Sequence, residues 1–117
     1  MKLTFRNDYG STVWVAIMYY DPSGCSEGGT STVNWDWATK GWWKIEPGQE
    51  AYVLNTNNQY ACYYAEAADG GYWAGDYLAR VFDTPFDYCN NLGVSGPPQW
   101  DVGMRLITVG PKALVRA

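Results

Sequence analysis

Histidine is absent from the 117 residues, and this absence removes several kinds of chemistry. Ser-His-Asp and Cys-His triads need an imidazole, and so do the common zinc and non-haem iron sites. The acids of the loops also lack the spacing of an EF-hand, so we expect neither a metal nor another cofactor.

Carboxylates remain available for catalysis, because a pair of them hydrolyses glycosides when held roughly 5 to 9 Å apart. Asp69, Asp76, Asp83 and Asp87 fall within one stretch of the chain. Twelve acids in a small domain give such neighbours by chance, and solvated loops explain them more simply. We therefore expect a protein that is not an enzyme.

Basic residues are also few, with 8 Lys and Arg against 12 Asp and Glu, a net charge of −4. A phosphate backbone needs a basic stripe, so nucleic acid is an unexpected partner. No run approaches the 18 or so apolar residues of a transmembrane span. The first residues alternate like a strand and do not resemble a signal peptide, so we expect no leader in this chain.

The three cysteines lack the Cys-x-x-Cys spacing of redox and zinc sites. Cys62 lies in an aromatic segment, where a buried thiol acts as a small hydrophobic group. Cys25 and Cys89 lie in separate polar loops. In an oxidising compartment we favour a disulfide between those two, which stabilises by roughly 3 to 4 kcal/mol. In a reducing compartment all three are free thiols.

Aromatic residues are abundant, at 17% of the chain, and 13 Gly and 6 Pro accompany them. This mixture is typical of short strands joined by tight turns. Strands at intervals of about ten residues predict one all-β domain over residues 1–117, an antiparallel β-sandwich with a small β-barrel as the alternative. The expected strands are residues 2–7, 13–20, 33–38, 41–45, 50–54, 60–67, 72–74 and 104–109.

Two segments carry more specific expectations. Residues 13–20 are apolar on both faces, so this strand should be central and covered on both sides. Asp69-Gly-Gly71 should close a hairpin between the strands on either side of it. Residues 76–80 could form one helical turn.

Four Trp fall within nine residues, in the stretch from Trp35 to Trp43. Successive strand residues point to opposite faces, so Trp42 and Trp43 cannot enter the same core. One should pack inward and the other should be partly exposed. Trp35 and Trp37 should share a face, with Asp36 on the other. An exposed Trp beside polar groups is a platform for a sugar ring or an interface, although a small β-sandwich can also use Trp in its core.

The motifs Phe5-Arg-Asn7, Val13-Trp-Val-Ala-Ile17, Trp37 to Gly48 and Tyr63-Tyr64-Ala65 together resemble the bacterial family called domain of unknown function 1036. The resemblance extends over residues 3–109, and its Gly-Trp-Trp…Pro-Gly part is the most specific. It implies a β-rich fold and favours an extracellular location, but it implies no activity. Family members often carry further cysteines that this sequence lacks, so the resemblance does not support a family disulfide here.

Three functions without catalysis fit these observations. The first is a lectin-like binding module that presents an aromatic surface to a carbohydrate. The second is a secreted effector or toxin, for example an insecticidal or membrane-active one, with peripheral membrane contact through Trp and Tyr. The third is a subunit of a larger assembly or a homodimer, with its aromatics covered by a protein partner. The candidate ligand-binding residues are Trp35, Asp36, Trp37, Trp43, Tyr72, Trp73, Asp76 and Asn90.

Overall fold

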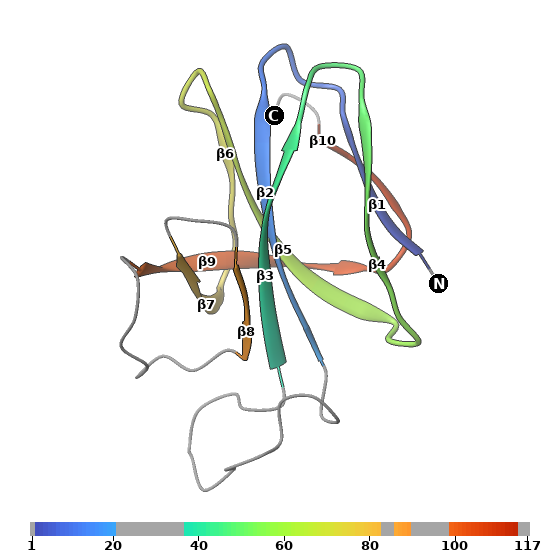
Figure 1. Cartoon of the computed structure of the whole chain (residues 1–117), viewed down its shortest axis with the longest axis vertical. Helices are drawn as coiled ribbons and strands as arrows, with labels where there is room; N and C mark the ends of the chain where they lie inside the picture. Colours follow the sequence, from blue (N-terminus) through green and yellow to red (C-terminus); the bar gives the residue numbers. More distant parts are fainter. Residues whose placement is uncertain (1, 21–36, 83–85, 90–98, 115–117) are drawn as a thin grey trace, which may run out of the picture.

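A computed structural model describes residues 2–20, 37–82, 86–89 and 99–114 of the chain. These residues form strands and turns, and none of them is helical (Figure 1). The strands are β1 (Lys2–Asn7), β2 (Val13–Tyr20), β3 (Trp37–Ile45), β4 (Glu50–Asn55), β5 (Tyr60–Ala67), β6 (Tyr72–Trp73), β7 (Tyr77–Phe82), β8 (Phe86–Cys89), β9 (Gln99–Thr108) and β10 (Pro111–Leu114).

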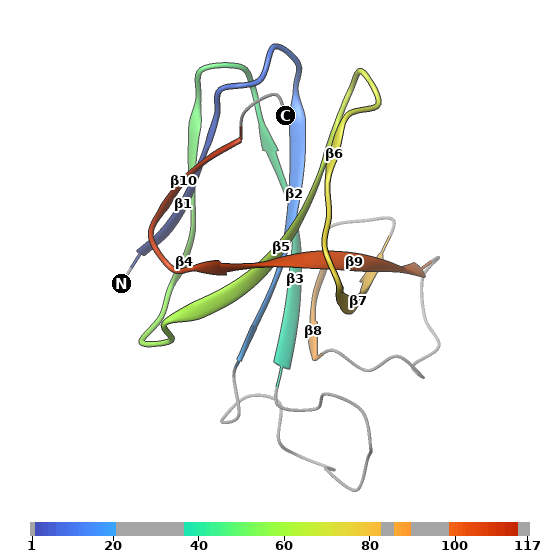
Figure 2. The same cartoon turned by 180° about the vertical axis from the view of Figure 1, so that it is seen from behind.

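The strands form two sheets, which confirms the predicted all-β fold. Sheet A has the order β10-β1-β4. Sheet B has the order β7-β9-β5-β2-β3-β8, with β6 paired to β5, and it curls into half a barrel. Figure 2 shows β9 running across the upright strands β2 and β3. The pairing of β1 with β10 is parallel, whereas the other described pairings are antiparallel.

The centre of sheet B is covered on both faces, as the apolar pattern of residues 13–20 predicts. Val13, Val15 and Ile17 of β2 pack with Leu3 and Phe5 of sheet A in a first core cluster. The alternate residues of the same strand pack in a second cluster, against the arm formed by β7 and β9. This second cluster contains Ala16, Met18, Cys62, Ala79, Val81, Val102 and Met104. We call the face of sheet B that encloses it the concave face.

The turns at one end of the sandwich meet at Asn7, whose side chain is fully buried. Its Nδ2 donates to the carbonyl oxygens of Ser11 (2.7 Å) and Ile45 (2.8 Å), and its Oδ1 accepts the amide of Tyr9 at 2.8 Å. Its backbone carbonyl also accepts the amide of Gly48, which has a φ of 81°. The side-chain amide of Asn7 therefore joins the β1–β2 turn to the end of β3.

Besides its pairing with β5, strand β9 closely approaches the segment after β6 at two glycines. The amide of Gly75, just after β6, donates to the carbonyl of Gly103 in β9 at 3.0 Å. A Cβ at Gly75 would lie 2.6 Å from the carbonyl oxygen of Met104, and one at Gly103 would overlap the carbonyl oxygen of Gly75. Glycine is needed at this crossing because the two backbones touch there.

The local predictions are only partly right. The Asp69-Gly-Gly71 hairpin is confirmed, because Glu66 pairs with Tyr72 and Gly70 adopts a φ of 92°. The helical turn at residues 76–80 is wrong, since β7 begins at Tyr77 and pairs with β9. Residues 37–45 form one strand and not parts of two. Strands β8 and β10 and the first half of β9 were not predicted.

Candidate functional site

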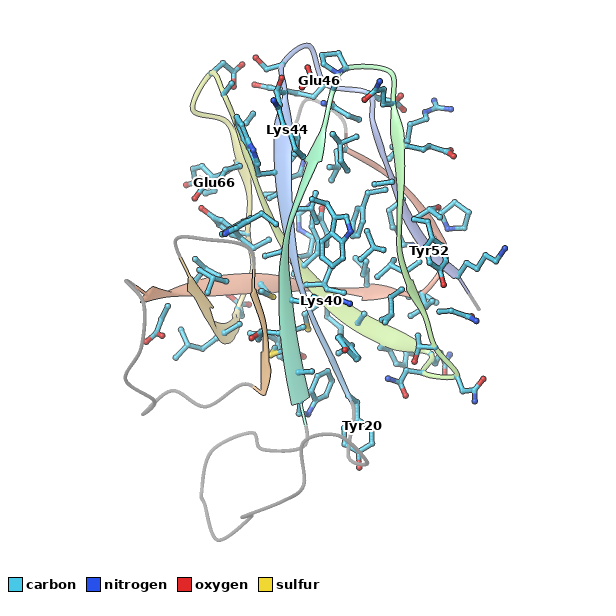
Figure 3. All side chains as sticks on the ribbon, in the orientation of Figure 1. Tyr20, Lys40, Lys44, Glu46, Tyr52 and Glu66 are labelled. Carbon is cyan, nitrogen blue, oxygen red and sulfur yellow. The ribbon has the colours of Figure 1, made fainter. Side chains whose placement is uncertain are left out.

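The most distinctive surface is a cross-strand row at one end of the concave face. In register across β6, β5, β2 and β3 lie Tyr72, Glu66, Trp14 and Lys44. Because directly paired residues share a face, these four side chains project from the same side of sheet B. Tyr72 is 70% exposed, and Trp14 is half-buried without joining either core cluster. Figure 3 shows Glu66 at the left of the molecule, Tyr52 at the right and Lys44 near the top between them.

A second row lies one step toward the arm. Tyr64 of β5 faces Ala16 of β2 on this side, and Trp42 follows Gly41 where the register of β3 shifts. Trp42 and Tyr64 meet edge to face, with ring centroids 6.2 Å apart, and both pack against the second core cluster. Their inner edges are held by the core while their outer parts stay accessible. We call Trp14, Trp42, Tyr64, Glu66 and Tyr72 together the aromatic face.

A hydrogen bond fixes the polar group of the aromatic face. The hydroxyl of Tyr64 donates to Oε1 of Glu66 at 2.8 Å. Burial, this hydrogen bond and the charge of Glu66 all raise the pKa of the Tyr64 phenol. The phenol therefore stays neutral and keeps donating across the physiological pH range. Oε2 of Glu66 has no hydrogen-bond partner among the described residues, so it is available to accept from a bound hydroxyl.

The upper border of the aromatic face carries charged and hydroxyl groups. The ammonium of Lys44 lies 3.6 Å from Oε1 of Glu46, and the hydroxyl of Thr12 donates to Oε2 of the same carboxylate at 2.9 Å. These groups come from the start of β2 and the end of β3, beside Trp14. The face thus combines flat aromatic rings with a fixed acceptor and a polar rim.

The structure separates the predicted binding residues that it describes. Tyr72 belongs to the aromatic face, but Trp73 points the other way and is only 7% exposed in the first core cluster. Trp73 is therefore corrected from a ligand contact to a core residue. Trp43 lies on that same inner side. Trp37 stacks edge to face on Tyr20 at the far end of the concave face, at 5.6 Å between centroids.

Trp37 cannot share a compact ligand with Tyr72. Trp37 pairs with Tyr20, and Trp14 lies six residues away along β2, which is about 20 Å of strand. Trp42 and Trp43 do project to opposite faces, as predicted, although both are half-buried. Asp76 is exposed just before β7.

The remaining predicted residues lie outside the part of the chain that the structure describes. Trp35, Asp36, Asn90 and Cys25 lie outside the described residues, and so does the side chain of Cys89, which leaves the proposed disulfide as a prediction. Cys62 is a buried free thiol, as expected, and burial raises its pKa to about 11.

Four of the five members of the aromatic face were not predicted: Trp14, Trp42, Tyr64 and Glu66. Part of the signal was present, because the alternation of residues 13–20 already placed Trp14 opposite the valines. The register between β2, β5 and β6 was missing. Only that register brings Glu66 and Tyr72 beside Trp14.

No family model, curated protein or solved structure matches this chain. Within the described part of the chain, no helix is long and apolar enough to cross a membrane. The function is therefore inferred from the geometry of the site.

Proposed function

We propose that the protein is a non-catalytic, lectin-like module that binds carbohydrate on the aromatic face. The observation that supports this proposal is the cross-strand row, in which Glu66 lies between Tyr72 and Trp14. A pyranose ring has an apolar face of C–H bonds and a polar edge of hydroxyl groups. Flat aromatic rings beside a fixed hydrogen-bond acceptor complement both features.

The spacing of the row fits a chain of sugars better than a single sugar. Tyr72 and Trp14 are two strands apart, which is about 10 Å at the usual spacing of paired strands. Each ring can stack with a separate sugar unit of an extended oligosaccharide. Oε2 of Glu66 would accept a hydroxyl proton from the chain between them.

Trp42 and Tyr64 would serve a different purpose from Tyr72. Both pack against the core and against each other, so little conformational entropy is lost when a ligand binds beside them. Preorganised rings of this kind favour binding by a rigid module. The family resemblance noted above implies no activity and neither adds to nor opposes this proposal.

The central carboxylate argues against the membrane-active alternative. Inserting the aromatic face into a lipid interface would remove water from Glu66, whose described partner is a neutral phenol. Removing water from a carboxylate without a cationic partner is unfavourable. A hydroxyl-rich ligand would replace that water with hydrogen bonds.

The experiment is a glycan array probed with the purified protein and with matched variants. Tyr72→Ala removes an exposed ring from the aromatic face, whereas Tyr52→Ala removes a ring of similar exposure, 55%, from sheet A. We expect binding to an oligosaccharide that falls at least tenfold in Tyr72→Ala and in Glu66→Gln but not in Tyr52→Ala. Equal loss in both tyrosine variants, or binding only to liposomes, would contradict the proposal.

A further inference from the structure

Glu66 is the charged member of the aromatic face, and no cation among the described residues pairs with it. The carboxylate is half-buried, and its described partner is the neutral phenol of Tyr64. The cation of the cross-strand row is Lys44, which lies on the far side of Trp14 and contacts Glu46 at 3.6 Å. Two carboxylates and one ammonium therefore leave an excess of one negative charge on the aromatic face and its border, and that charge belongs to Glu66.

Aromatic rings lie on either side of this carboxylate. Tyr72 and Trp14 are both directly paired with Glu66, so each is one strand spacing away, about 5 Å. Burial, the hydrogen bond and charge of Glu66, and Tyr72 all raise the pKa of the Tyr64 phenol, so the two phenols lie close enough to interact. The faces of such rings carry partial negative charge. The carboxylate and the rings together therefore favour a positively charged group over a neutral one.

A protonated amine satisfies both features of this arrangement. An ammonium group that donates to Oε2 of Glu66 forms a charge-assisted hydrogen bond, which is stronger than the bond from a neutral hydroxyl. At that position it can also lie within about 6 Å of a ring centroid, the range of a cation–π contact. The net charge of −4 on the whole chain adds a long-range attraction for a cationic ligand.

We propose that the carbohydrate bound on the aromatic face is an amino-sugar oligosaccharide, with a protonated amine at Oε2 of Glu66. This assignment rests on the proposed function, because the sugar rings stack on Tyr72 and Trp14 as described there. The ammonium group lies between the two rings. N-acetylation of the amine removes its charge, so Glu66 distinguishes the free amino sugar from its acetylated form.

The test compares two tetrasaccharides that have the same backbone, the tetramer of glucosamine and the tetramer of N-acetylglucosamine. Isothermal titration calorimetry at pH 6 and low salt, where most of the sugar amines are protonated, measures both affinities. We expect the glucosamine tetramer to bind at least about fivefold more tightly. Raising the salt concentration should weaken the glucosamine tetramer and have little effect on the acetylated one. Spermine, a cation of similar charge without sugar rings, should bind much more weakly than the glucosamine tetramer.

Variants assign the preference to Glu66. Glu66→Gln keeps the shape of the side chain and should bring the ratio of the two affinities close to one. Glu50→Gln is the matched control, because it removes the same charge from an exposed position on sheet A, and it should keep the preference. Tyr72→Ala should weaken both tetramers and leave their ratio unchanged.

The two proposals can fail separately. Equal affinity for the two tetramers, with both lost in Tyr72→Ala, would overturn the amino-sugar assignment and leave the carbohydrate proposal intact. A preference that survives Glu66→Gln, or binding of neither tetramer, would also overturn the assignment, and the glycan array would then decide the carbohydrate proposal by itself. Spermine binding as tightly as the glucosamine tetramer would contradict both, because charge alone would explain the affinity.

Discussion

Asn7→Asp should be one of the most damaging single-atom changes in this protein. The new carboxylate keeps the shape of Asn7 and still accepts the amide of Tyr9, but its second oxygen faces two carbonyl oxygens. Two hydrogen bonds of about 1 kcal/mol each are lost, and an unpaired charge is buried, so we expect a total of about 3–5 kcal/mol at pH 7. That corresponds to a fall in Tm of about 10–20 °C for a domain of this size.

The loss should depend on pH in a defined direction. Burial among carbonyl oxygens raises the pKa of the new carboxyl in the folded state above its unfolded value of about 3.9. Well below the unfolded pKa of about 3.9 both states are protonated, and the carboxylic acid can donate one of the missing hydrogen bonds. As the pH rises, the unfolded chain releases this proton first, so the stability deficit grows until the folded-state pKa is passed.

Urea unfolding at pH 4.5 and pH 7, followed by Trp fluorescence, measures both effects. Asn57→Asp is the control, because Asn57 is exposed in the β4–β5 turn. A cost below about 1 kcal/mol at pH 7, or equal costs for the two variants, would refute the role assigned to Asn7.

Three further predictions concern packing. Gly103→Ala should lower the free energy of unfolding by more than about 2 kcal/mol, because its Cβ overlaps the backbone that follows β6. Gly10 has open space around it, so Gly10→Ala should lower it by less than about 1 kcal/mol. Urea unfolding of the two variants measures both values. Trp73→Ala should lower the free energy of unfolding by about 3–5 kcal/mol, because Trp73 is buried in the core. Its exposed neighbour is less important for stability, so Tyr72→Ala should lower it by less than about 1 kcal/mol. Similar Tm values for the two variants would contradict the assignment of faces. Burial raises the pKa of Cys62 to about 11, so its thiol should resist alkylation at pH 8 until urea unfolds the chain. Peptide mass mapping measures the labelling of Cys62, and rapid labelling in the native state would contradict this prediction.

The fold was largely predictable because strand periodicity is a local property. The apolar residues on both faces of β2 predicted its central position, and the Gly-rich turn of residues 69–71 predicted the β5–β6 hairpin. The arm was missed for a local reason as well. Ala79 and Val81 point inward, but alanine and arginine in the same segment also suit a helix, so pattern alone was ambiguous.

The candidate site was less predictable because it depends on register between distant strands. Tyr72 and Trp73 are adjacent, and the sequence alone does not say which of them faces the core. Pairing of Ala65 with Trp73 places the indole inside, and the next pair places Tyr72 outside beside Glu66. A shift of one residue would exchange their roles. The residue types indicated that aromatic side chains form the site, but only the pairing of the strands shows which of them share a face.

We can test whether the aromatic face receives a carbohydrate by NMR of the indole N–H groups, each assigned by substitution, during titration with a panel of oligosaccharides. We predict that one oligosaccharide shifts the signals of Trp14 and Trp42, on the aromatic face, and leaves the buried Trp73 in place. Shifts confined to other tryptophans, or no shift of Trp14 and Trp42 with any member of the panel, would contradict the claim.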